Sequence, residues 1–409
     1  MISVITELRV AGRNLRRNRN RTAVAMLTVV GGLLAYLLAG GFIEWIFENM
    51  RESTIRSQLG HIQIVRPNYF EKGIADPYNF LLPSNSEELN RISKNPDVLT
   101  VAQRVAFSGL VSLGDTTVNF MGEGIDPLRE AVISDQIHIR EGSNLEKSGE
   151  RSALLGEGLA KNLGAKPGDT IVLLVTAANG TPNAIEVTVA GTFFTSAKEF
   201  DDVALRLPIQ LTQKLMRING ATSWVILLKD TDQTTLVVSK LRSTLLADGF
   251  EVVPWIDLAD FYNKTVALFG TQVSLMRAII ALIIILTISN TQTMSVLERT
   301  TEIGTMMALG SRRSVVLRMF VLEGLLIGIT GGIAGVVLGY VIAAILSKTG
   351  IPMPPAPGME TGFTAQILVT PWLSINAIEL AIVTTLIASA MPAWKASRMN
   401  IVDALRCNQ

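Results

Sequence analysis

Residues 298–313, ERTTEIGTMMALGSRR, are a short polar stretch between two long apolar ones. An apolar run over residues 278–297 leads into it, and a second run follows from Val315 to about Leu346. The stretch itself holds two acidic residues, three arginines and two glycines. Apolar runs of this length cross a membrane as helices, because every backbone polar group inside lipid must be bonded within the segment. The sequence therefore predicts a transmembrane helical hairpin with a charged turn.

The overall composition supports a membrane protein. The 409 residues are 48% apolar and 17% charged, whereas soluble chains are about 25% charged. A net charge of +1 gives no basic field for nucleic acid, so no nucleic-acid partner is expected. The single cysteine, Cys407, excludes a disulfide within one chain. His61 and His138 lie in no recognisable metal-ligand spacing, and we expect both to be ordinary surface or half-buried side chains.

Sequence motifs that mark enzymes are missing. The chain contains no GxxxxGKS/T phosphate-binding loop, no GxSxG nucleophile elbow, no HExxH pair and no CxxC. We therefore expect a non-catalytic membrane subunit that has no catalytic residue, metal site or cofactor of its own.

Four apolar stretches are long enough to cross a hydrocarbon core of about 30 Å. They cover residues 23–43, 278–297, 315–347 and 372–394. The long segment between the first two has room for its own core. The predicted fold class is an α-helical membrane protein with four transmembrane helices and a large mixed α/β extracytoplasmic domain inserted between helices 1 and 2.

Arginine and lysine residues near the span ends predict the orientation. Six arginines lie within residues 1–21, three more lie between the second and third spans, and Arg318 lies near the start of the third. Three basic residues follow the fourth span, whereas the connection 348–371 holds only Lys348. Both termini and the turn at 298–314 are therefore expected in the cytoplasm, and the insertion and the connection 348–371 outside.

The helical pattern of the first span continues to about Leu59, and another begins near Asp257. Both helices are therefore expected to extend beyond the membrane as a stalk. The predicted parts are a cytoplasmic amphipathic helix (1–21), transmembrane helix 1 with its stalk (22–59), an external α/β domain (60–256), the second stalk with transmembrane helix 2 (257–297), the cytoplasmic turn (298–314), transmembrane helix 3 (315–347), an external Pro-rich loop (348–371), transmembrane helix 4 (372–394) and a cytoplasmic tail (395–409).

Short β-branched runs and helical periodicity predict mixed secondary structure in the external domain. The candidate strands are 61–65, 109–113, 118–121, 170–175, 185–191 and 224–228, and the candidate helices are 157–163, 209–217 and 232–247. In the N-terminal segment, apolar residues alternate with arginines at helical spacing, which predicts a helix on the anionic membrane surface. Membrane lipid is therefore an expected partner.

Ionisable residues inside the spans are candidates for specific roles. Glu323 is expected to pair with Arg318 at a helix end or with a group of a cytoplasmic partner. Glu379 either contacts a lateral gate or reaches the interface, and Arg277 is expected to reach the interface. The polar residues 289–292 are expected to form hydrogen bonds between helices rather than to line a channel.

A small-residue face lies on the third span. Gly331, Gly335 and Gly339 are spaced by four, so they share one side of a helix and permit close approach of a neighbour. That neighbour is either a helix of the same protomer or one across a dimer, and the sequence leaves both open.

Two stretches carry a family resemblance. ERTTEIGTMMALGSRRSVVLRMFVLEG (298–324) and PAWKASRMNIVDALR (392–406) resemble the FtsX-like permease domain. The order of one helix, a large external domain and three helices is also similar to that family. The family includes the permeases of the macrolide exporter MacB and of the lipoprotein-release complex LolCDE, which are mechanotransmission (type VII) ABC transporters. The resemblance implies a MacB-like periplasmic core domain.

The resemblance implies that the turn is a coupling helix that docks on a separate ABC ATPase dimer, in which ATP and Mg are bound. The matching residues and their neighbours are Glu298, Arg299, Glu302, Ile303, Gly304, Ala308, Leu309, Gly310 and Arg312. It further implies a second permease copy or paralogue, a periplasmic carrier or adaptor protein, and a bacterial inner-membrane location.

The function implied is conversion of cytoplasmic ATP hydrolysis into periplasmic work, with extraction of a lipoprotein or other lipidic cargo. QLGHIQIVRP (58–67) resembles the domain entry of lipoprotein-release permeases. Trp45, Phe47 and Phe269 on the stalks are the candidate cargo contacts. The alternatives are MacB-like efflux of a drug, peptide or siderophore through an adaptor and duct, and FtsX-like signalling to periplasmic hydrolases. Cargo, homo- or heterodimer and the role of the loop 352–357 stay open.

Overall fold

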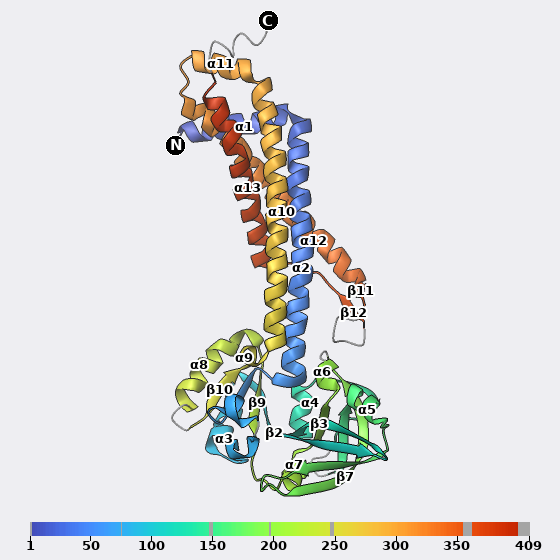
Figure 1. The fold of residues 1–409 in the computed structure, drawn as a ribbon. Helices are drawn as coiled ribbons and strands as arrows, with labels where there is room; N and C mark the ends of the chain where they lie inside the picture. The colour runs from blue at the N-terminus through green and yellow to red at the C-terminus, as the bar shows by residue number, and fades with distance from the viewer. Residues whose placement is uncertain are drawn as a thin grey trace. The chain divides into compact units, whose positions relative to one another are not determined.

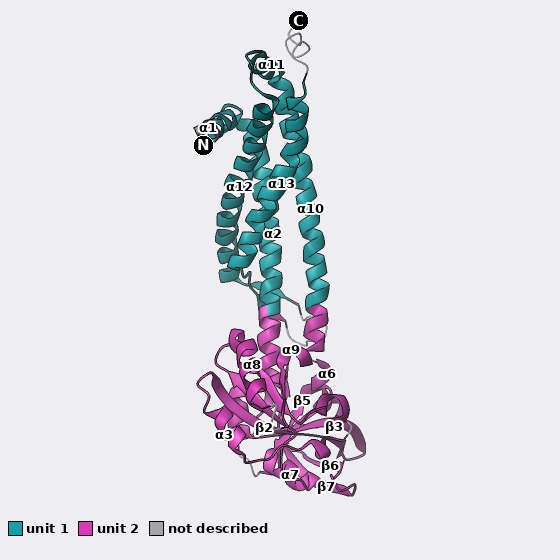
Figure 2. Cartoon of the chain, turned by 90° about the vertical axis from the view of Figure 1, so that its left-hand side faces the viewer, with its two compact units in different colours: residues 1–47, 266–353, 364–409 teal, residues 48–265, 354–363 magenta. Residues whose placement is uncertain are grey.

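The computed structural model describes residues 2–74, 76–146, 150–195, 198–245, 249–354 and 362–399, with the backbone alone for 2–6. It divides into two compact units (Figure 2). The helical unit contains residues 1–47, 266–353 and 364–409, and the α/β unit contains residues 48–265 and 354–363. Cys407 and most of the predicted cytoplasmic tail lie outside the described residues, as do residues 355–361 of the Pro-rich loop.

Four of the described helices are long and apolar enough to cross a membrane, as predicted. Each of the four predicted spans lies inside one of them. A short helix, α11, joins the second to the third, and α1 precedes the first (Figure 1). The helices are α1 (Ile2–Arg17), α2 (Arg19–Thr54), α10 (Asp260–Glu298), α11 (Thr300–Ala308), α12 (Arg313–Thr349) and α13 (Pro371–Ser397).

Local chemistry defines the ends of these helices. The Thr370 hydroxyl accepts a hydrogen bond from the Leu373 amide at 3.1 Å, and Pro371 follows as the first helical residue of α13. Gly310 has a φ of +94° just after α11, and Gly350 has a φ of +72° just after α12. Glycine adopts this left-handed backbone without a Cβ penalty, so the chain can leave each helix sharply.

The glycine face of α12 packs inside the chain, which decides the alternative left open by the sequence. A Cβ atom at Gly335 would lie 3.0 Å from the Cβ atom of Leu33. The helices can approach this closely because the glycines have no side chain. Gly331, Gly335 and Gly339 face three side chains of α2 in register: Val29, Leu33 and Leu37.

A second pair of glycines sets the contact between α12 and α13. A Cβ atom at Gly328 would meet the Thr385 side chain and, at 3.2 Å, the Ala381 carbonyl oxygen. Gly324 lies against Ser389 in the same way. Small residues therefore seat α12 between α2 and α13, with the buried side chains of the bundle around them.

The α/β unit is built on one mixed sheet, so the predicted mixed α/β class is confirmed. The strands run in the order β10-β1-β9-β2-β3-β8-β5-β7-β4, and β6 pairs with β2 and β7. The pairs β3–β8 and β5–β7 are parallel and the others are antiparallel. The strands are β1 (Ile62–Val65), β2 (Val98–Leu113), β3 (Thr116–Ile125), β4 (His138–Gly142), β5 (Ser152–Gly156), β6 (Thr170–Thr176), β7 (Pro182–Phe194), β8 (Ala204–Pro208), β9 (Ser223–Leu228) and β10 (Glu251–Pro254).

Helices of this unit cover two apolar clusters. One cluster lies beneath α5 and α7, and the other joins α3 and α8 to β1 and β9 around the buried Trp224. The helices are α3 (Glu87–Ser93), α4 (Pro127–Ile133), α5 (Glu157–Leu163), α6 (Lys198–Asp201), α7 (Ile209–Met216), α8 (Thr234–Leu245) and α9 (Trp255–Leu258).

The predicted strands and helices of this region overlap observed ones, and 157–163 coincides with α5. The sequence pattern missed the short strands β4, β5, β8 and β10 and the short helices α3, α4, α6 and α9, because so few residues give only a weak periodic signal. It also missed the first half of β2, which spans 16 residues. The predicted helical continuation to Leu59 is α-helical only to Thr54 and then forms a π-helix, η1 (Ile55–Leu59). The strands β11 (Ile351–Met353) and β12 (Phe363–Ala365) pair within the segment 348–371, which was predicted as a Pro-rich loop.

Candidate functional site

The α11 turn, residues 298–313, has an inner and an outer face. Ile303 and Met307 are buried against Val316 and Phe320 of α12. The outer face carries Glu298, Glu302, Ala308, Leu309, Gly310 and Arg312, all exposed. Leu309, at its tip, is 83% exposed. The turn therefore exposes apolar residues at its tip, while its inner face is packed against α12.

A buried ion pair fixes the base of this turn. Arg299 is 7% exposed and Glu323 is 5% exposed, and their side chains pair at 3.1 Å. Arg299 also contacts Glu302 at 3.3 Å and lies over the Phe320 ring. The Asn14 amide donates to Glu323 at 2.8 Å. Because each charge in this dry region has a partner, the turn is held in one orientation.

Of the two alternatives predicted for Glu323, the pairing with Arg318 is wrong. Arg318 pairs with Glu7 of α1 at 3.3 Å, and Glu323 pairs with Arg299 across the turn. Arg318 is five residues from Glu323 on the same helix, and residues so spaced do not share a face. The arginine that reaches Glu323 is the one that packs over Phe320.

Arginines of α1 and of the start of α2 contact the acidic residues of the turn. Arg17 donates to both carboxylate oxygens of Glu302 at 2.9 Å, and Arg21, at the start of α2, pairs with Glu298. The hydrogen bond from Arg17, followed by the contact with Arg299, holds the pKa of Glu302 below its usual value. α1 runs across the end of the bundle near α11 (Figure 1). The Arg17–Glu302 pair is half exposed, so it orients Glu302 more than it stabilises the fold.

Gly304 is one of the residues that match the coupling-helix pattern. It is buried on the inner face of α11. A bulky substitution there would disturb the packing of the turn. Of the nine predicted coupling residues, six therefore lie on the outer face and three, Arg299, Ile303 and Gly304, support it from inside.

The predicted stalk residues include one direct pair. The rings of Phe47 and Phe269 meet edge to face with centroids 6.1 Å apart, and Trp45 is half-buried. Glu379 is exposed on α13, and Arg277 is half-buried on α10. The aromatic pair therefore joins α2 to α10.

Within the part of the chain that the structure describes, the polar residues 289–292 do not form the predicted bonds between helices. Thr291 donates to the Thr287 carbonyl of its own helix at 2.7 Å. Asn290 is exposed, and Gln292 is 4% exposed. Neither amide atom of Gln292 has a hydrogen-bond partner among the described residues. A backbone carbonyl one turn away satisfies the Thr291 hydroxyl, but such a carbonyl cannot satisfy a buried carboxamide.

In the α/β unit, two buried arginines bind the end of η1. Arg104 donates to the Gln58 carbonyl, and Arg206 donates to the Ser57 carbonyl at 3.2 Å. These are carbonyls that a helix end leaves without partners. Both arginines are less than 5% exposed. Through them the end of the first long helix is tied to strands β2 and β8.

Carboxylates balance these two arginines. Glu130 of α4 pairs with Arg104 at 2.5 Å and lies 3.8 Å from Arg206. Glu123 of β3 pairs with Arg206 at 2.9 Å. Burial works against the charged form of Glu130, but Arg104 and then Arg206 outweigh it and lower the pKa of Glu130. The four side chains, Arg104, Glu123, Glu130 and Arg206, are called the arginine joint below.

His61 is not the surface or half-buried side chain that we expected. It is 1% exposed, its Nδ1 accepts from the Leu228 amide at 3.1 Å, and its Nε2 lies 2.9 Å from the Thr231 hydroxyl. Thr231 in turn donates to Glu52 at 2.8 Å. Burial lowers the pKa of His61 to about 4. The neutral imidazole therefore joins the base of α2 to β9 as a structural group.

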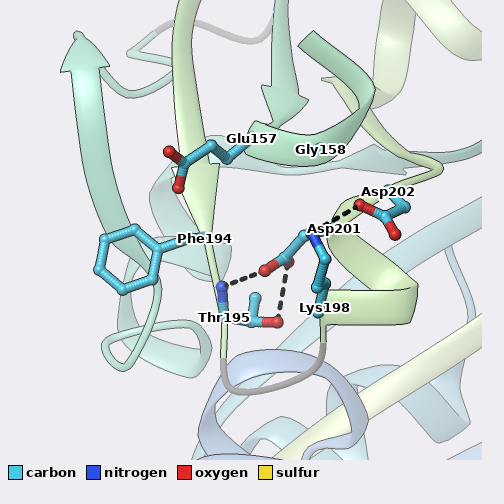
Figure 3. Close-up of a pocket in the computed structure, with 7 residues that line it drawn as sticks. All are labelled: Glu157, Gly158, Phe194, Thr195, Lys198, Asp201 and Asp202. Carbon is cyan, nitrogen blue, oxygen red and sulfur yellow. Dashed lines mark hydrogen bonds and ion pairs between the residues drawn. The ribbon is translucent and has the colours of Figure 1, made fainter. Parts of the chain in front are cut away.

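A small hollow beside α6 contains a buried carboxyl (Figure 3). Asp201 accepts hydrogen bonds from the amide and the hydroxyl of Thr195, both at 2.9 Å. Lys198 contacts Asp202 at 3.4 Å. Burial is the main cause that raises the pKa of Asp201 to about 6. The described residues contain no group of three or more potential metal ligands. The contacts of Asp201 with Thr195 and of Lys198 with Asp202 therefore indicate a structural role, in which they hold the end of this loop.

Substituting Asp201 by asparagine should change the pH dependence of stability. The folded pKa of about 6 exceeds the unfolded value of 3.8, so this carboxyl favours folding below about pH 4 and the contribution is lost as the pH rises to about 6. Asp201→Asn keeps an acceptor for the Thr195 amide and cannot ionise. We expect the variant to be about 1–2 kcal/mol more stable than wild type at neutral pH. This value is smaller than the full pKa shift would give, because water partly screens the carboxylate.

Denaturant unfolding of the α/β unit in the full chain, at pH values between about 4 and 7.5, measures this effect. Asp202→Asn, at the more exposed neighbour, is the control and should follow the wild type. An unchanged pH slope in Asp201→Asn would contradict the assignment.

Sequence reasoning missed the arginine joint and the contacts of α1. Arg104, Glu130 and Arg206 lie far apart in sequence and belong to different elements, so no local spacing links them. The one available signal is charge inside apolar strands: Arg206 interrupts the buried strand ALRLP. Buried charges are rare unless they are paired, so such an interruption indicates a specific partner.

Comparisons with known proteins agree with this architecture. Residues 22–244 match the MacB-like periplasmic core domain, and residues 274–401 match the C-terminal region of FtsX-like permeases. The lipoprotein-releasing system transmembrane protein LolC of Xylella fastidiosa is 28% identical over 307 residues, which are 70% of this chain and 72% of LolC. LolE of Haemophilus influenzae is 24% identical over 418 residues, which are 96% of each chain.

A third relative is the macrolide export ATP-binding/permease protein MacB of Hyphomonas neptunium, with 32% identity over 212 residues. That match covers 50% of this chain and only 30% of MacB. Because the MacB-like domain model covers more than half of the chain and the FtsX-like model covers most of the rest, the assignment rests on both units. The chain belongs to the FtsX-like and MacB-like family of ABC transporter permeases.

Proposed function

We propose that this permease carries motion from a separate ABC ATPase dimer, which binds ATP and Mg, to its α/β unit on the opposite side of the membrane. The proposed work is extraction of a lipidic cargo, a lipoprotein or another amphiphile, from a bacterial inner membrane. The observation that carries the proposal is the exposed outer face of the α11 turn on its packed base. The LolC and LolE relatives are named as lipoprotein-releasing proteins, which supports the cargo class.

The outer face of the α11 turn has the features of a docking surface. Leu309 is 83% exposed at the tip, with Ala308 and Gly310 beside it and Arg312 beyond. An exposed leucine gains about 1.5–3 kcal/mol when a partner fully buries it. The buried Arg299–Glu323 pair keeps the base rigid, so a push on the tip moves α10 and α12 rather than bending the turn.

The long helices provide the route for this motion. α10 spans 39 residues and α2 spans 36 residues without interruption. The arginine joint ties the end of η1 to β2 and β8 through carbonyl groups. A displacement of α2 along its axis would therefore act on the sheet through buried charged contacts. The edge-to-face pair Phe47–Phe269 is the proposed apolar contact for cargo.

The orientation and the remaining partners are part of the proposal. The arginine-rich ends predict that α1, the α11 turn and the C-terminus lie in the cytoplasm. A second permease copy or a paralogue would complete the complex, and a periplasmic carrier would receive the cargo. The similarity to MacB supports one alternative, efflux of a drug, peptide or siderophore with an adaptor and duct.

Substituting Leu309 by aspartate tests the coupling surface. Leu309 makes little contact within the chain, so we expect Leu309→Asp to insert and fold as the wild type does. Binding of the ATPase should fall at least about tenfold, because an apolar anchor is lost and a charge must be desolvated. The measurement is co-purification of the ATPase with the permease, followed by ATP turnover in lipid.

The matched control is Leu128→Asp. Leu128 lies on α4 of the α/β unit and is 76% exposed, so it receives the same substitution at a similar exposure. It should leave ATPase binding unchanged. If Leu309→Asp retained wild-type assembly and transport, the coupling proposal would be wrong.

A further inference from the structure

The acidic residues of the α11 turn are already paired within the chain. Glu302 accepts two hydrogen bonds from Arg17 at 2.9 Å, and Glu298 pairs with Arg21. Arg299, the first arginine of the turn, is buried in its base and forms ion pairs there. The charges of these three turn residues are therefore balanced inside the chain, before any partner binds.

Two cations remain at the tip of the turn. Arg312 and Arg313 follow the exposed Leu309 closely in the chain, and both are exposed. Their side chains have no hydrogen bond, ion pair or ring contact with any other residue that the structure describes. The sequence of residues 298–313, with two acidic residues and three arginines, is nearly balanced in charge. In the folded chain, by contrast, two unpaired positive charges lie beside an apolar tip.

The stability of α12 does not account for these two arginines. Arg312 is the N-cap residue of α12 and makes no capping hydrogen bond, and Arg313 is the first helical residue. The first turn of α12 contains no acidic residue. A helix N-terminus carries a partial positive charge, so cations there are unfavourable, whereas carboxylates stabilise it. Two cations at this position, beside the exposed Leu309, indicate that an anionic surface meets the tip.

The distance of these arginines from the membrane core favours a protein surface over a lipid surface. Residues 324–347 of α12 carry no charge, and at 1.5 Å per residue they span about 36 Å, enough to cross a core of about 30 Å. Arg313 lies eleven residues before this stretch, which is about 16 Å along the helix. The headgroup layer adds only about 5–8 Å on each side of the core, so both arginines lie beyond it.

We propose that the α11 turn docks in an apolar pocket of the ATPase whose rim is acidic. Leu309 enters the pocket, and Arg312 and Arg313 pair with carboxylates on its rim. Complementary charge of this kind raises the rate of association and rejects partners of the wrong sign. This inference rests on the proposed coupling function and adds the chemistry of the partner's surface.

Arginines of α1 and of the start of α2 have a positioning role in this docking. Arg17 balances Glu302, and Arg21 balances Glu298. Without them, two carboxylates of the turn would face the acidic rim and repel it, because like charges that meet across an interface cost free energy. The N-terminal arginines thus set the sign of the charge that the turn presents.

The two members of the Arg17–Glu302 pair should give effects of opposite sign. Arg17→Gln leaves the Glu302 carboxylate unbalanced, so it should weaken ATPase binding by about threefold. Glu302→Gln removes the carboxylate and frees Arg17, so binding should be at least as tight as in wild type. A purely structural role of the pair would not produce this difference, because either substitution breaks the same contact.

Reversal of the two arginines at the tip tests the rim directly. The double variant Arg312→Glu with Arg313→Glu should unfold at no lower temperature than wild type, because carboxylates suit a helix N-terminus. Its affinity for the ATPase should fall at least about tenfold at low salt. The difference should shrink at about 1 M salt, where charges are screened beyond about 3 Å.

The experiment titrates the full-length permease, in phosphatidylcholine nanodiscs, with the purified ATPase that co-purifies with the wild type. A second series uses phosphatidylglycerol nanodiscs. Arg151→Glu is the matched control, because Arg151 is an exposed arginine of the α/β unit whose side chain contacts no other described residue through a hydrogen bond or ion pair. This variant should bind the ATPase as wild type does.

Each outcome decides the proposal. Weaker binding of Arg17→Gln and of the double arginine variant, with binding retained in Glu302→Gln, would support it. The opposite signs for Arg17→Gln and Glu302→Gln would indicate a basic rim and overturn it. Charge effects seen only in phosphatidylglycerol nanodiscs would assign the arginines to lipid and overturn it as well.

The result for Leu309→Asp separates this inference from the coupling function on which it rests. If Leu309→Asp lost the ATPase while every charge variant bound it as wild type does, the coupling function would stand and the acidic rim would be overturned. If the wild type bound no ATPase, both would be overturned.

Discussion

Arg104→Met is expected to destabilise the α/β unit by about 3–5 kcal/mol, because it leaves a buried carboxylate without its main partner. Glu130 is 1% exposed and pairs with Arg104 at 2.5 Å. Its remaining cation, Arg206, is 3.8 Å away and already paired with Glu123. The Gln58 carbonyl at the end of η1 also loses its donor. For a unit of this size the loss corresponds to a fall in Tm of roughly 10 °C.

Thermal unfolding of the full chain and hydrogen exchange measure this effect. The exchange protection of α4 and of residues 55–59 should fall together, because the arginine joint connects them. Arg140→Met is the control, since Arg140 is half exposed and its contact with Glu157 is 3.7 Å long. That variant should unfold within about 0.5 kcal/mol of wild type, as expected for a surface site.

A double variant separates the charge effect from the loss of packing. Arg104→Met with Glu130→Leu removes both charges, and replacing a buried ion pair by apolar groups is often nearly neutral. We expect it to recover a large part of the lost stability, with the Gln58 carbonyl still unpaired. If Arg104→Met alone unfolded like wild type, the arginine joint would not carry the stability assigned to it.

Photo-crosslinking of cargo is expected to give adducts at the stalk aromatics and none at the other end of α10. Probes at Phe47 and Phe269 lie on the apolar edge-to-face pair, which offers a surface for acyl chains. A probe at Asn290 is exposed on the same long helix as Phe269. A cargo path through the bundle would need a continuous polar lining, whereas α12 presents buried glycines packed against α2 and α13.

The crosslinking compares probes at these positions in membranes with the ATPase present, and cargo adducts are detected by mass spectrometry. Trp45, which is half-buried on the same stalk, serves as a third stalk position. Strong adducts at Asn290 with none at Phe47 or Phe269 would mean that cargo passes through the bundle. That result would exclude the proposed mechanism, whatever the cargo.

The sequence predicted the features that depend on local periodicity and length. An apolar run of about 20 residues has few ways to satisfy its backbone other than a membrane helix, so all four spans could be found. Helix 157–163 was equally clear, because apolar positions at helical spacing end at Gly164, which has a φ of +73°. The charged turn after residue 297 could be recognised for the same reason, because it lies between two such apolar runs.

The choice of partners depended on tertiary structure. The spacing of Gly331, Gly335 and Gly339 shows that something packs closely against α12, but spacing carries no information about which helix does so. The structure places α2 there. Likewise Glu323 needed a cation, and the nearest one in sequence, Arg318, pairs instead with Glu7 of α1.

By itself, the sequence determined the four long apolar helices, their suitability for a membrane and the place of the charged turn, because backbone hydrogen bonding and hydrophobic burial act on neighbours along the chain. Only the tertiary structure decided that Gly304 supports the turn from inside and that Arg104 and Arg206 close the end of η1. It also decided that Gln292 lies buried with no hydrogen-bond partner among the described residues. These properties depend on which faces meet, and packing sets those faces between segments far apart in the chain.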